Sequence, residues 1–493
     1  MKKCVIAIDV GTSGCKAIAV DESGAILSGV IGEYPLYQPQ PGRTEQDPAD
    51  WWRESASSVK QVLSEIGDAE VCAIGLSGQM HGMVALDRSG EVVRNAILWN
   101  DQRTQKQCDE ITAAAGGLSG LLGYTNNMML TGYTGGKILW MKEEEPDNYA
   151  RTKTVVNPKD YIGYKLTGQL STEVSDASGT GLFDVEHRVW AWELIDKIGL
   201  KREFFTKALE STDRMGTVTP EASALTGLPA GTPVYAGGGD AVISTTGMGL
   251  ITPGRIGVSL GTSGVVAAGL PGYAENKDGL LQLFCNNAPE RWMAFGCTLS
   301  AAGSLQWFRD ALGGGDNYRA LDDQAEAIAP GADGLLFLPY LTGERCPLFD
   351  PEAKGAFLGI QSVMGKGHFS RAVLEGVAFS LRQVFDLIRS ASPGILTDEI
   401  VISGGGAKSP LWQQILADIF QLPVRTVHGS AEGSAFGAAL VAGTGCGMWP
   451  SIDKAMEVAI PENETLPNPD NFPIYQRQYD KYIKMYDALK WSF

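Results

Sequence analysis

Residues 5–14 read VIAIDVGTSG, and residues 255–264 read RIGVSLGTSG. Each stretch is an apolar run that predicts a buried strand, followed by a Gly-Thr-Ser-Gly turn and a second apolar run at 16–20 or 265–268. The same strand–turn–strand unit therefore occurs twice, about half a chain apart. A duplicated unit of this kind predicts two related domains. The boundary between them is expected at 245–254, where Gly, Thr and Pro are concentrated.

The segments around these units alternate in type. A helix is expected over 49–65, with Asp50 near its start, and a buried strand over 71–76. Strands that alternate with helices predict the α/β class. Near the C-terminus, residues spaced by 4, 3, 4 and 3 positions form one helical face, namely Tyr475, Tyr479, Tyr482, Tyr486 and Leu489. This spacing predicts a terminal helix that docks through an aromatic stripe.

The composition excludes several classes of protein. The chain has 493 residues, with 40 Lys+Arg against 57 Asp+Glu and a net charge of −17. This balance argues against a nucleic-acid-binding protein and a polybasic membrane anchor. No stretch reaches the roughly 18 apolar residues of a spanning helix, and the apolar run before Asp9 is too short for a signal peptide. The eight cysteines form no C-x-x-C pair, which is typical of reduced cytosolic thiols, so a cytoplasmic protein is expected.

The two Gly-Thr-Ser-Gly turns are candidate phosphate sites. Glycine lets backbone N–H groups approach an anion, and the hydroxyls add donors. Either turn alone is better explained as a plain hairpin, whereas the pair favours a polyphosphate bound between two lobes. Asp9 precedes the first turn, and a carboxylate there is explained if Mg²⁺ sits between it and the phosphate. The alternative is a strand-end Asp that caps local N–H groups.

Asp240 is a candidate general base. It follows the strand residues 234–236 and the three glycines 237–239, which are expected to leave room beside the carboxylate. A carboxylate in such a place could deprotonate a substrate hydroxyl. The local pattern favours equally a helix start with Asp240 as its N-cap.

Three further segments follow apolar strands, where open α/β sheets bind ligands. The Gly-rich turn 403–410 suits a flat nucleoside, or is an ordinary strand-to-helix loop. His81 within 77–82 is a candidate ligand group, although a lone histidine is more often structural. Trp99 within 99–103 suits a sugar or polyol, as would any polar strand end.

Six segments, in order along nearly the whole chain, resemble the motifs of one family. They are Asp9–Ser13, Ser77–Gly82, Leu98–Asp101, Gly132–Trp140, Tyr340–Pro347 and Gly355–Ile360 with its continuation to Glu375. The first resembles a phosphate motif, the fourth and sixth resemble the two family signatures, and the others are similar to sugar-binding segments. Together they resemble the FGGY family of carbohydrate kinases, and within it the xylulokinases.

The resemblance implies two actin-like domains of the ribonuclease-H type that flank a deep catalytic cleft. The domains would be 1–246, carrying the sugar site, 247–445, binding ATP, and a C-terminal segment, 446–493. It implies ATP-dependent phosphorylation of a primary hydroxyl of a ketopentose, with D-xylulose as the first choice. The cofactors would be ATP and Mg²⁺. Dimers are common in the family, so the resemblance allows a homodimer, whereas the sequence itself does not indicate the oligomeric state.

The resemblance also assigns roles to single residues. Asp240 resembles the catalytic base, and Asp9 with Asp240 would serve Mg²⁺. The sugar side is Met80, His81, Trp99 and Asp240. The nucleotide side is Gly11, Thr12, Ser13, Gly261, Thr262, Gln306, Gly405, Gly406 and Ala407.

One position departs from the family pattern. Xylulokinases usually carry Asn after the catalytic Asp, whereas this chain has Ala241. Loss of a hydrogen bond at a polyol site changes discrimination between sugars. A kinase for ribulose, erythritol, glycerol or gluconate therefore remains an alternative. An actin-like ATPase switch without a sugar acceptor is a less favoured one.

Overall fold

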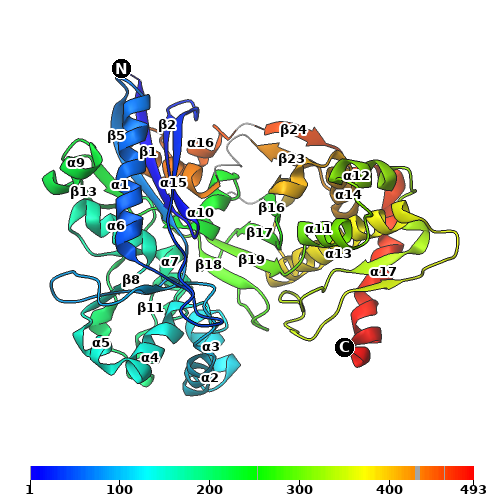
Figure 1. Ribbon diagram of the computed structural model, residues 1–493, viewed down its shortest axis with the longest axis horizontal. Coiled ribbons are helices and arrows are strands. Elements are labelled where there is room, and N and C mark those ends of the chain that lie inside the picture. Colours follow the sequence, from blue (N-terminus) through cyan, green and yellow to red (C-terminus); the bar gives the residue numbers. More distant parts are fainter. Residues whose placement is uncertain (1, 252–253, 428–432, 460) are drawn as a thin grey trace.

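The N-terminal Gly-Thr-Ser-Gly turn joins two neighbouring strands, β1 and β2, of a seven-stranded sheet (Figure 1). The structure is a computed structural model, which describes residues 2–251, 254–427, 433–459 and 461–493. The sheet has the order β13-β14-β5-β1-β2-β3, with β15 also paired to β5. Its strands are β1 (Lys3–Val10), β2 (Gly14–Asp21), β3 (Ile26–Glu33), β5 (Glu70–Gly78), β13 (Arg214–Thr217), β14 (Pro233–Tyr235) and β15 (Gly238–Gly239).

The second Gly-Thr-Ser-Gly turn joins two strands of another seven-stranded sheet, in the order β18-β19-β17-β16-β22-β23-β24. Its strands are β16 (Gly254–Leu260), β17 (Gly264–Leu270), β18 (Gln282–Cys285), β19 (Trp292–Thr298), β22 (Thr397–Ser403), β23 (Val424–Val427) and β24 (Pro461–Thr465). In both sheets the strand before the turn pairs antiparallel with the strand after it and parallel with a later strand, β5 or β22. The predicted α/β class with two related sheets is therefore confirmed.

The first sheet is covered on both faces. Alternate residues of β1 explain this, because Ile6 and Ile8 join the core under helix α1 (Pro48–Glu65), whereas Val5 and Ala7 join the core on the opposite face. The predicted helix at 49–65 is confirmed, but its N-cap is Asp47, whose side chain accepts from the backbone N–H of Ala49 at 2.9 Å. A residue at the cap position satisfies an N–H group that has no partner within the helix.

The opposite face of the first sheet is covered by a helix from late in the chain, α15 (Gly433–Gly445). Its close approach depends on glycine, since a Cβ atom on Gly75 of β5 would lie 2.2 Å from the Ala438 carbonyl oxygen. The chain then passes through α16 (Ile452–Met456) and returns to the second sheet as β24. Helix α15 therefore packs on the first sheet, although its residues fall within the range expected for the second domain. The domain limits themselves stay a prediction.

The second sheet carries the long helix α13 (Lys366–Ala391), with α11 (Ala302–Ala311), α12 (Tyr318–Glu326) and α14 (Pro410–Phe420) nearby (Figure 1). The C-terminal helix α17 (Phe472–Leu489) packs on α13 as its tyrosine spacing predicts, because Tyr475, Tyr479 and Tyr482 all contact the Phe379 ring. Within the described residues, no helix combines the length and apolarity needed to span a membrane.

The first half is completed by shorter helices: α2 (Gln105–Ala114), α3 (Leu118–Thr125), α4 (Thr134–Glu144), α5 (Pro146–Arg151), α6 (Pro158–Thr167), α7 (Val174–Ser178), α8 (Trp192–Lys197), α9 (Pro220–Thr226) and α10 (Asp240–Gly247). Short strand pairs connect them: β4 (Glu45–Gln46) with β7 (Ala96–Ile97), β6 (Val84–Leu86) with β8 (Thr154–Val156), β9 (Thr172–Glu173) with β12 (Ala208–Leu209), and β10 (Phe183–Asp184) with β11 (Val189–Trp190). In the second half, β20 (Leu336–Leu338) pairs with β21 (Ala356–Leu358).

Candidate active site

Asp9 and Asp240 lie at the ends of parallel strands of the first sheet. Asp9 of β1 pairs in register with Ser77 of β5, and Gly238 of β15 pairs with the same Ser77 from the other side. Asp240 follows two residues later as the first residue of α10. The carboxyl ends of parallel strands are where open α/β sheets bind ligands. The register therefore brings the two predicted carboxylates to one edge.

The Asp9 carboxylate is held by two hydroxyl groups. Ser77 Oγ donates to Oδ1 at 2.7 Å, and Ser434 Oγ of α15 donates to Oδ2 at 2.6 Å. Burial raises the pKa of Asp9, while these two hydrogen bonds and the charge of Lys16 act in the opposite direction. Because each carboxylate oxygen accepts one hydrogen bond, the Asp9 side chain is held in one orientation, and the lone pairs that remain point in fixed directions.

Asp240 has a pKa raised to about 7, first because the group is buried and second because Asp9 is negatively charged. The N–H groups of Ala241 and Met80 act in the opposite direction, and Ala241 N donates to Oδ1 at 2.7 Å. A carboxyl group with a pKa near neutrality is suited to accept a proton in a reaction at physiological pH. The N-cap of α10 is Gly239, so the alternative with Asp240 as N-cap is wrong.

The three glycines before Asp240 do not leave open space, which corrects the expectation. A Cβ atom on Gly237, which has φ +70°, would lie 1.8 Å from the Leu76 carbonyl oxygen. On Gly238 it would lie 2.3 Å from Asn287 Nδ2, and on Gly239 2.4 Å from Met80 Cγ. Glycine is needed because this strand presses against its neighbours. The side chain of Met80 is thereby placed beside the backbone that carries Asp240.

The first Gly-Thr-Ser-Gly turn is connected to Trp99. The indole N–H of Trp99 donates to Thr12 Oγ1 at 2.9 Å, and the Thr12 hydroxyl donates to Gln79 Oε1 at 3.3 Å. Gln46 Nε2 donates to the Thr12 carbonyl oxygen at 2.7 Å, and Ser13 is exposed. Trp99 is 45% exposed, so nearly half of its surface is accessible.

His81 is fixed through both its backbone and its ring. It has φ +68°, and Lys137 Nζ donates to its carbonyl oxygen at 2.7 Å. Its Nδ1 lies 2.6 Å from the Gly179 carbonyl oxygen, which can only accept, so Nδ1 carries the proton. Burial lowers the pKa of His81 to about 3, so the ring is neutral and Nε2 is a hydrogen-bond acceptor. The ring stacks on Tyr133 at 4.6 Å.

The second half reaches this cluster. Phe284 of β18 contacts the rings of His81 and Tyr133, each at 6.3 Å. The positive charge of Arg345 contributes to the lowered pKa of His81. Arg345 belongs to the segment 340–347, so this segment comes near enough to His81 for its charge to act on the ring, and the sugar-binding role of the segment stays a prediction.

The second half also contains a cavity of about 920 Å³. Four predicted nucleotide residues line it, namely Thr262, Gln306, Gly405 and Gly406. Two do not: the carbonyl oxygen of Gly261 accepts from Ala302 N, and that of Ala407 accepts from Gln413. A Cβ atom on Gly405 would meet nothing within 4 Å. This volume is in the range of small-molecule sites, which are usually about 300–1,000 Å³.

Several residues of the site were not predicted. Ser434, Gln46 and Lys137 hold Asp9, Thr12 and His81 respectively. Ser434 lies 425 positions from Asp9, and no local pattern marks it. Lys137 lies inside the segment 132–140, so a motif was visible there although its role was not.

Among the described residues no group of three or more His, Cys, Asp or Glu side chains could hold a metal ion. A site with Asp9 and Asp240 alone still suits Mg²⁺, which is usually bound through one or two carboxylates together with substrate phosphates and water. The negative charge of Asp9 helps to raise the pKa of Asp240, so the two carboxylates influence each other.

Comparisons with known proteins show which family the sequence and the fold resemble. Residues 4–247 match the N-terminal domain of the FGGY family of carbohydrate kinases, and residues 256–446 match its C-terminal domain. The xylulose kinase of Bacillus subtilis is 37% identical over 99% of this chain and 97% of its own. The crystal structure of xylulose kinase from Rhodospirillum rubrum has a TM-score of 0.92 at 29% identity, covering 99% of both chains. The gluconate kinase of Lactobacillus acidophilus has a TM-score of 0.93 at 26% identity, covering 100% of this chain and 99% of its own.

Proposed function

This chain belongs to the FGGY family of carbohydrate kinases, and from that premise we propose that it transfers the γ-phosphoryl group of ATP to a primary hydroxyl of D-xylulose, forming D-xylulose 5-phosphate. The observation that carries the choice of sugar is the likeness to proteins named xylulose kinase over nearly the whole chain. The fold by itself supports less, because a protein named gluconate kinase shares it.

ATP would bind with its adenosine in the cavity of the second half. Gly405 and Gly406 would offer backbone rather than side-chain atoms to the adenine ring, and Gln306 adds a polar group. The phosphates would lie between the two Gly-Thr-Ser-Gly turns, against Thr12 and Thr262. The same proposal assigns Gly11, Ser13, Gly261 and Ala407 to the nucleotide side.

Asp9 and Asp240 would hold Mg²⁺. When bound, the cation neutralises part of the charge on the phosphates. Ser77 and Ser434 keep the Asp9 carboxylate in one orientation for this purpose. Most of the catalytic effect in phosphoryl transfer comes from positioning and electrostatic stabilisation.

Asp240 would act as the base. The sugar hydroxyl oxygen forms a bond to the γ-phosphorus, the bond from that phosphorus to the oxygen of ADP breaks, and the hydroxyl proton passes to the Asp240 carboxylate. A pKa of about 7 leaves a large part of Asp240 ionised at neutral pH and still makes it a better proton acceptor than an ordinary carboxylate.

The sugar would lie against Met80, His81 and Trp99. His81 Nε2 can accept a hydrogen bond from a sugar hydroxyl, because Nδ1 already donates to Gly179. Trp99, which is partly exposed, would offer apolar ring surface to the carbon skeleton. Ala241 offers no polar side chain, so this position makes no side-chain hydrogen bond that would distinguish one sugar from another.

Three further statements belong to the same proposal. The enzyme acts in the cytoplasm. It assembles as a homodimer, and it has no nucleic-acid or membrane partner. Its domains are 1–246, 247–445 and the C-terminal segment 446–493.

A substrate panel tests the function. ADP release is measured with D-xylulose, D-ribulose, glycerol, erythritol and gluconate, and with no sugar. The proposal requires that D-xylulose gives the highest kcat/KM, and that Asp240→Ala still binds sugar in calorimetry but releases almost no ADP. ADP release at the same rate without sugar would instead support the actin-like switch. Near-normal turnover by Asp240→Ala would refute the role of the base.

A further inference from the structure

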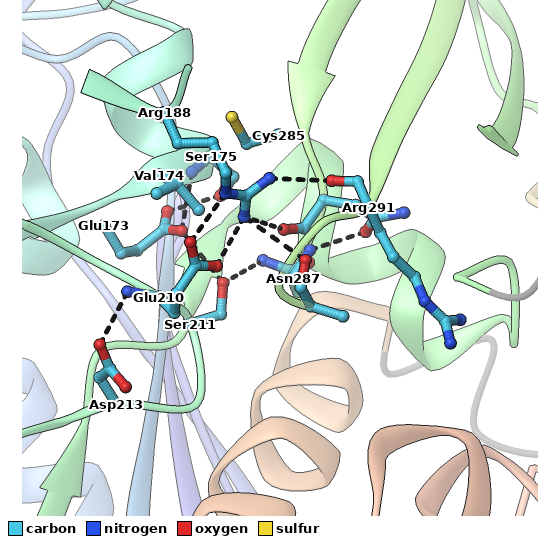
Figure 2. A network of polar contacts seen from close by, with 12 residues as sticks. Glu173, Val174, Ser175, Arg188, Glu210, Ser211, Asp213, Cys285, Asn287 and Arg291 are labelled. Carbon is cyan, nitrogen blue, oxygen red and sulfur yellow. Dashed lines mark hydrogen bonds and ion pairs between the residues drawn. The ribbon is translucent and has the colours of Figure 1, made fainter. Parts of the chain in front are cut away.

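A buried polar network contacts the segment that carries Asp240 through the backbone N–H of Gly239. Figure 2 shows this network. Its centre is Glu173, the last residue of β9 and the N-cap of the five-residue helix α7. The Glu173 carboxylate accepts four hydrogen bonds, from Ser175 N at 2.8 Å, Asp176 N at 2.7 Å, Ser175 Oγ at 2.5 Å and Ser211 Oγ at 3.1 Å. These donors use the lone pairs of both carboxylate oxygens, so the direction of each bond is settled.

The Ser175 hydroxyl is therefore oriented. Its proton goes to Glu173, and its oxygen accepts the backbone N–H of Gly239 at 3.0 Å. Gly239 is the N-cap of α10 and has no side chain with which to cap that helix. The start of α10, and with it Asp240, is thus fixed by a side chain from another element.

The network also contacts Gly238 and α10 through Asn287. Asn287, in the loop between β18 and β19, donates from Nδ2 to Ser211 Oγ at 2.9 Å and accepts from Thr246 Oγ1 of α10 at 3.0 Å. Its Nδ2 lies where a side chain on Gly238 would be. Arg188 fastens the same loop, since it pairs with Glu210 at 2.6 Å and donates to the Arg291 carbonyl oxygen at 3.0 Å (Figure 2).

We propose that Ser175 is a positioning residue for Asp240: its hydroxyl, oriented by Glu173, holds the Gly239 N–H and so fixes the backbone from which the base projects. This inference rests on the proposed function, in which Asp240 accepts the hydroxyl proton. Misplacing a reacting group by about 1 Å can cost roughly 100-fold in rate. Loss of the Ser175 hydroxyl should therefore act on the chemical step more than on binding.

The same helix offers a matched control. Ser178 is also buried on α7 and also accepts a backbone N–H, from Cys285 at 3.2 Å, while its own hydroxyl donates to the Val174 carbonyl oxygen at 2.6 Å. Ser175→Ala and Ser178→Ala remove the same atom from the same helix and leave one buried N–H without its partner in each case. Only the first of these N–H groups adjoins Asp240.

The experiment measures kcat, the KM values for D-xylulose and ATP, and the melting temperature of both variants. We expect both variants to melt below the wild type, Ser175→Ala by more, because it also removes a hydrogen bond to the buried Glu173 carboxylate. Ser175→Ala should lower kcat at least about tenfold with both KM values within about twofold, whereas Ser178→Ala should keep kcat within about twofold of the wild type. Equal loss of kcat in the two variants, or an unchanged kcat in Ser175→Ala, overturns the proposal.

A second variant covers poor folding of Ser175→Ala. Ser175→Cys keeps the shape of the side chain but replaces the hydroxyl with a much weaker acceptor, so its kcat should also fall while its KM values hold. A kcat equal to that of the wild type would contradict the role of Ser175. Wild-type enzyme and Asp240→Ala are run in the same assay, because lack of xylulose-dependent ADP release in the first, or its persistence in the second, would refute the proposed function instead.

Discussion

Replacing Asp240 by Asn should make the protein more stable and at the same time inactive. The substitution keeps the size of the side chain and the oxygen that accepts from Ala241 N at 2.7 Å. It removes the negative charge, and with it the ability to take a proton from the sugar. General base catalysis contributes about 10²–10⁴-fold to rate, so kcat should fall by that order.

The size of the gain in stability follows from the pKa of Asp240, which is raised from an ordinary 3.8 to about 7 by burial and by the charge of Asp9. One pKa unit corresponds to about 1.4 kcal/mol, so ionised Asp240 destabilises the folded chain by up to about 4 kcal/mol. The folded pKa lies above the unfolded pKa. The cost is therefore absent below about pH 4, grows between pH 4 and 7, and is complete above pH 7.

The assay is thermal unfolding of wild type and Asp240→Asn from pH 4.5 to 8.5, without nucleotide or divalent cation, together with kcat at pH 8. We expect the variant to melt higher at pH 8 and the difference to shrink toward pH 4.5. Asp68→Asn, at an exposed carboxyl, controls for the general effect of removing one charge from a chain of net charge −17. If Asp240→Asn melts no higher than wild type at pH 8, then ionised Asp240 does not destabilise the folded chain, which would refute this prediction.

Three other predictions concern the sugar, the proton and the nucleotide. Ala241→Asn should change the ratios of kcat/KM among ketopentoses while the KM for ATP stays the same, and unchanged ratios would make Ala241 a bystander. The kcat/KM for ATP should fall about tenfold per pH unit below pH 7, since Asp240 must be ionised to accept the proton. A fall in kcat/KM that begins only below pH 5 would contradict this. His81 does not contribute to the fall, because its pKa of about 3 keeps it neutral over this range. Gly405→Val should raise the KM for ATP at unchanged melting temperature, because its side chain would enter the cavity without meeting protein atoms. Gly394→Val, at a glycine with equally open surroundings outside the cavity, should leave the KM for ATP unchanged.

Those features that depend on short stretches of sequence were predictable. The duplicated turn predicted two sheets, because a strand, a tight turn and a returning strand are coded within about fifteen residues. The strand pattern predicted that Asp9, His81 and Trp99 would each lie at the end of a strand. The structure places Trp99 on Thr12, and Met80, which precedes His81, against Gly239. Local patterns contain this information because neighbouring parallel strands end at one edge.

Those features that depend on distant contacts were not predictable. The three glycines before Asp240 indicate an unusual backbone, but the sequence does not say whether they leave space or allow close packing. The answer lies in Leu76, Asn287 and Met80, each from a different part of the chain. Ser175 is equally silent in the sequence, since a serine in a five-residue helix has no signature and its partner Gly239 lies 64 positions away.

The helix α15 shows why the two carboxylates form one site. It lies against β1 and β5, where Ser434 donates to Asp9, and also against α10, where a Cβ atom on Gly437 would lie 1.9 Å from the Ile243 carbonyl oxygen. One helix therefore contacts the strand that carries Asp9 and the helix that begins with Asp240. A bulky residue at position 437 would force α10 away from α15 and so change the separation of the carboxylates without touching either. Gly437→Val should accordingly lower kcat as well as the melting temperature, and a variant that lost only melting temperature would show that the two carboxylates are positioned independently.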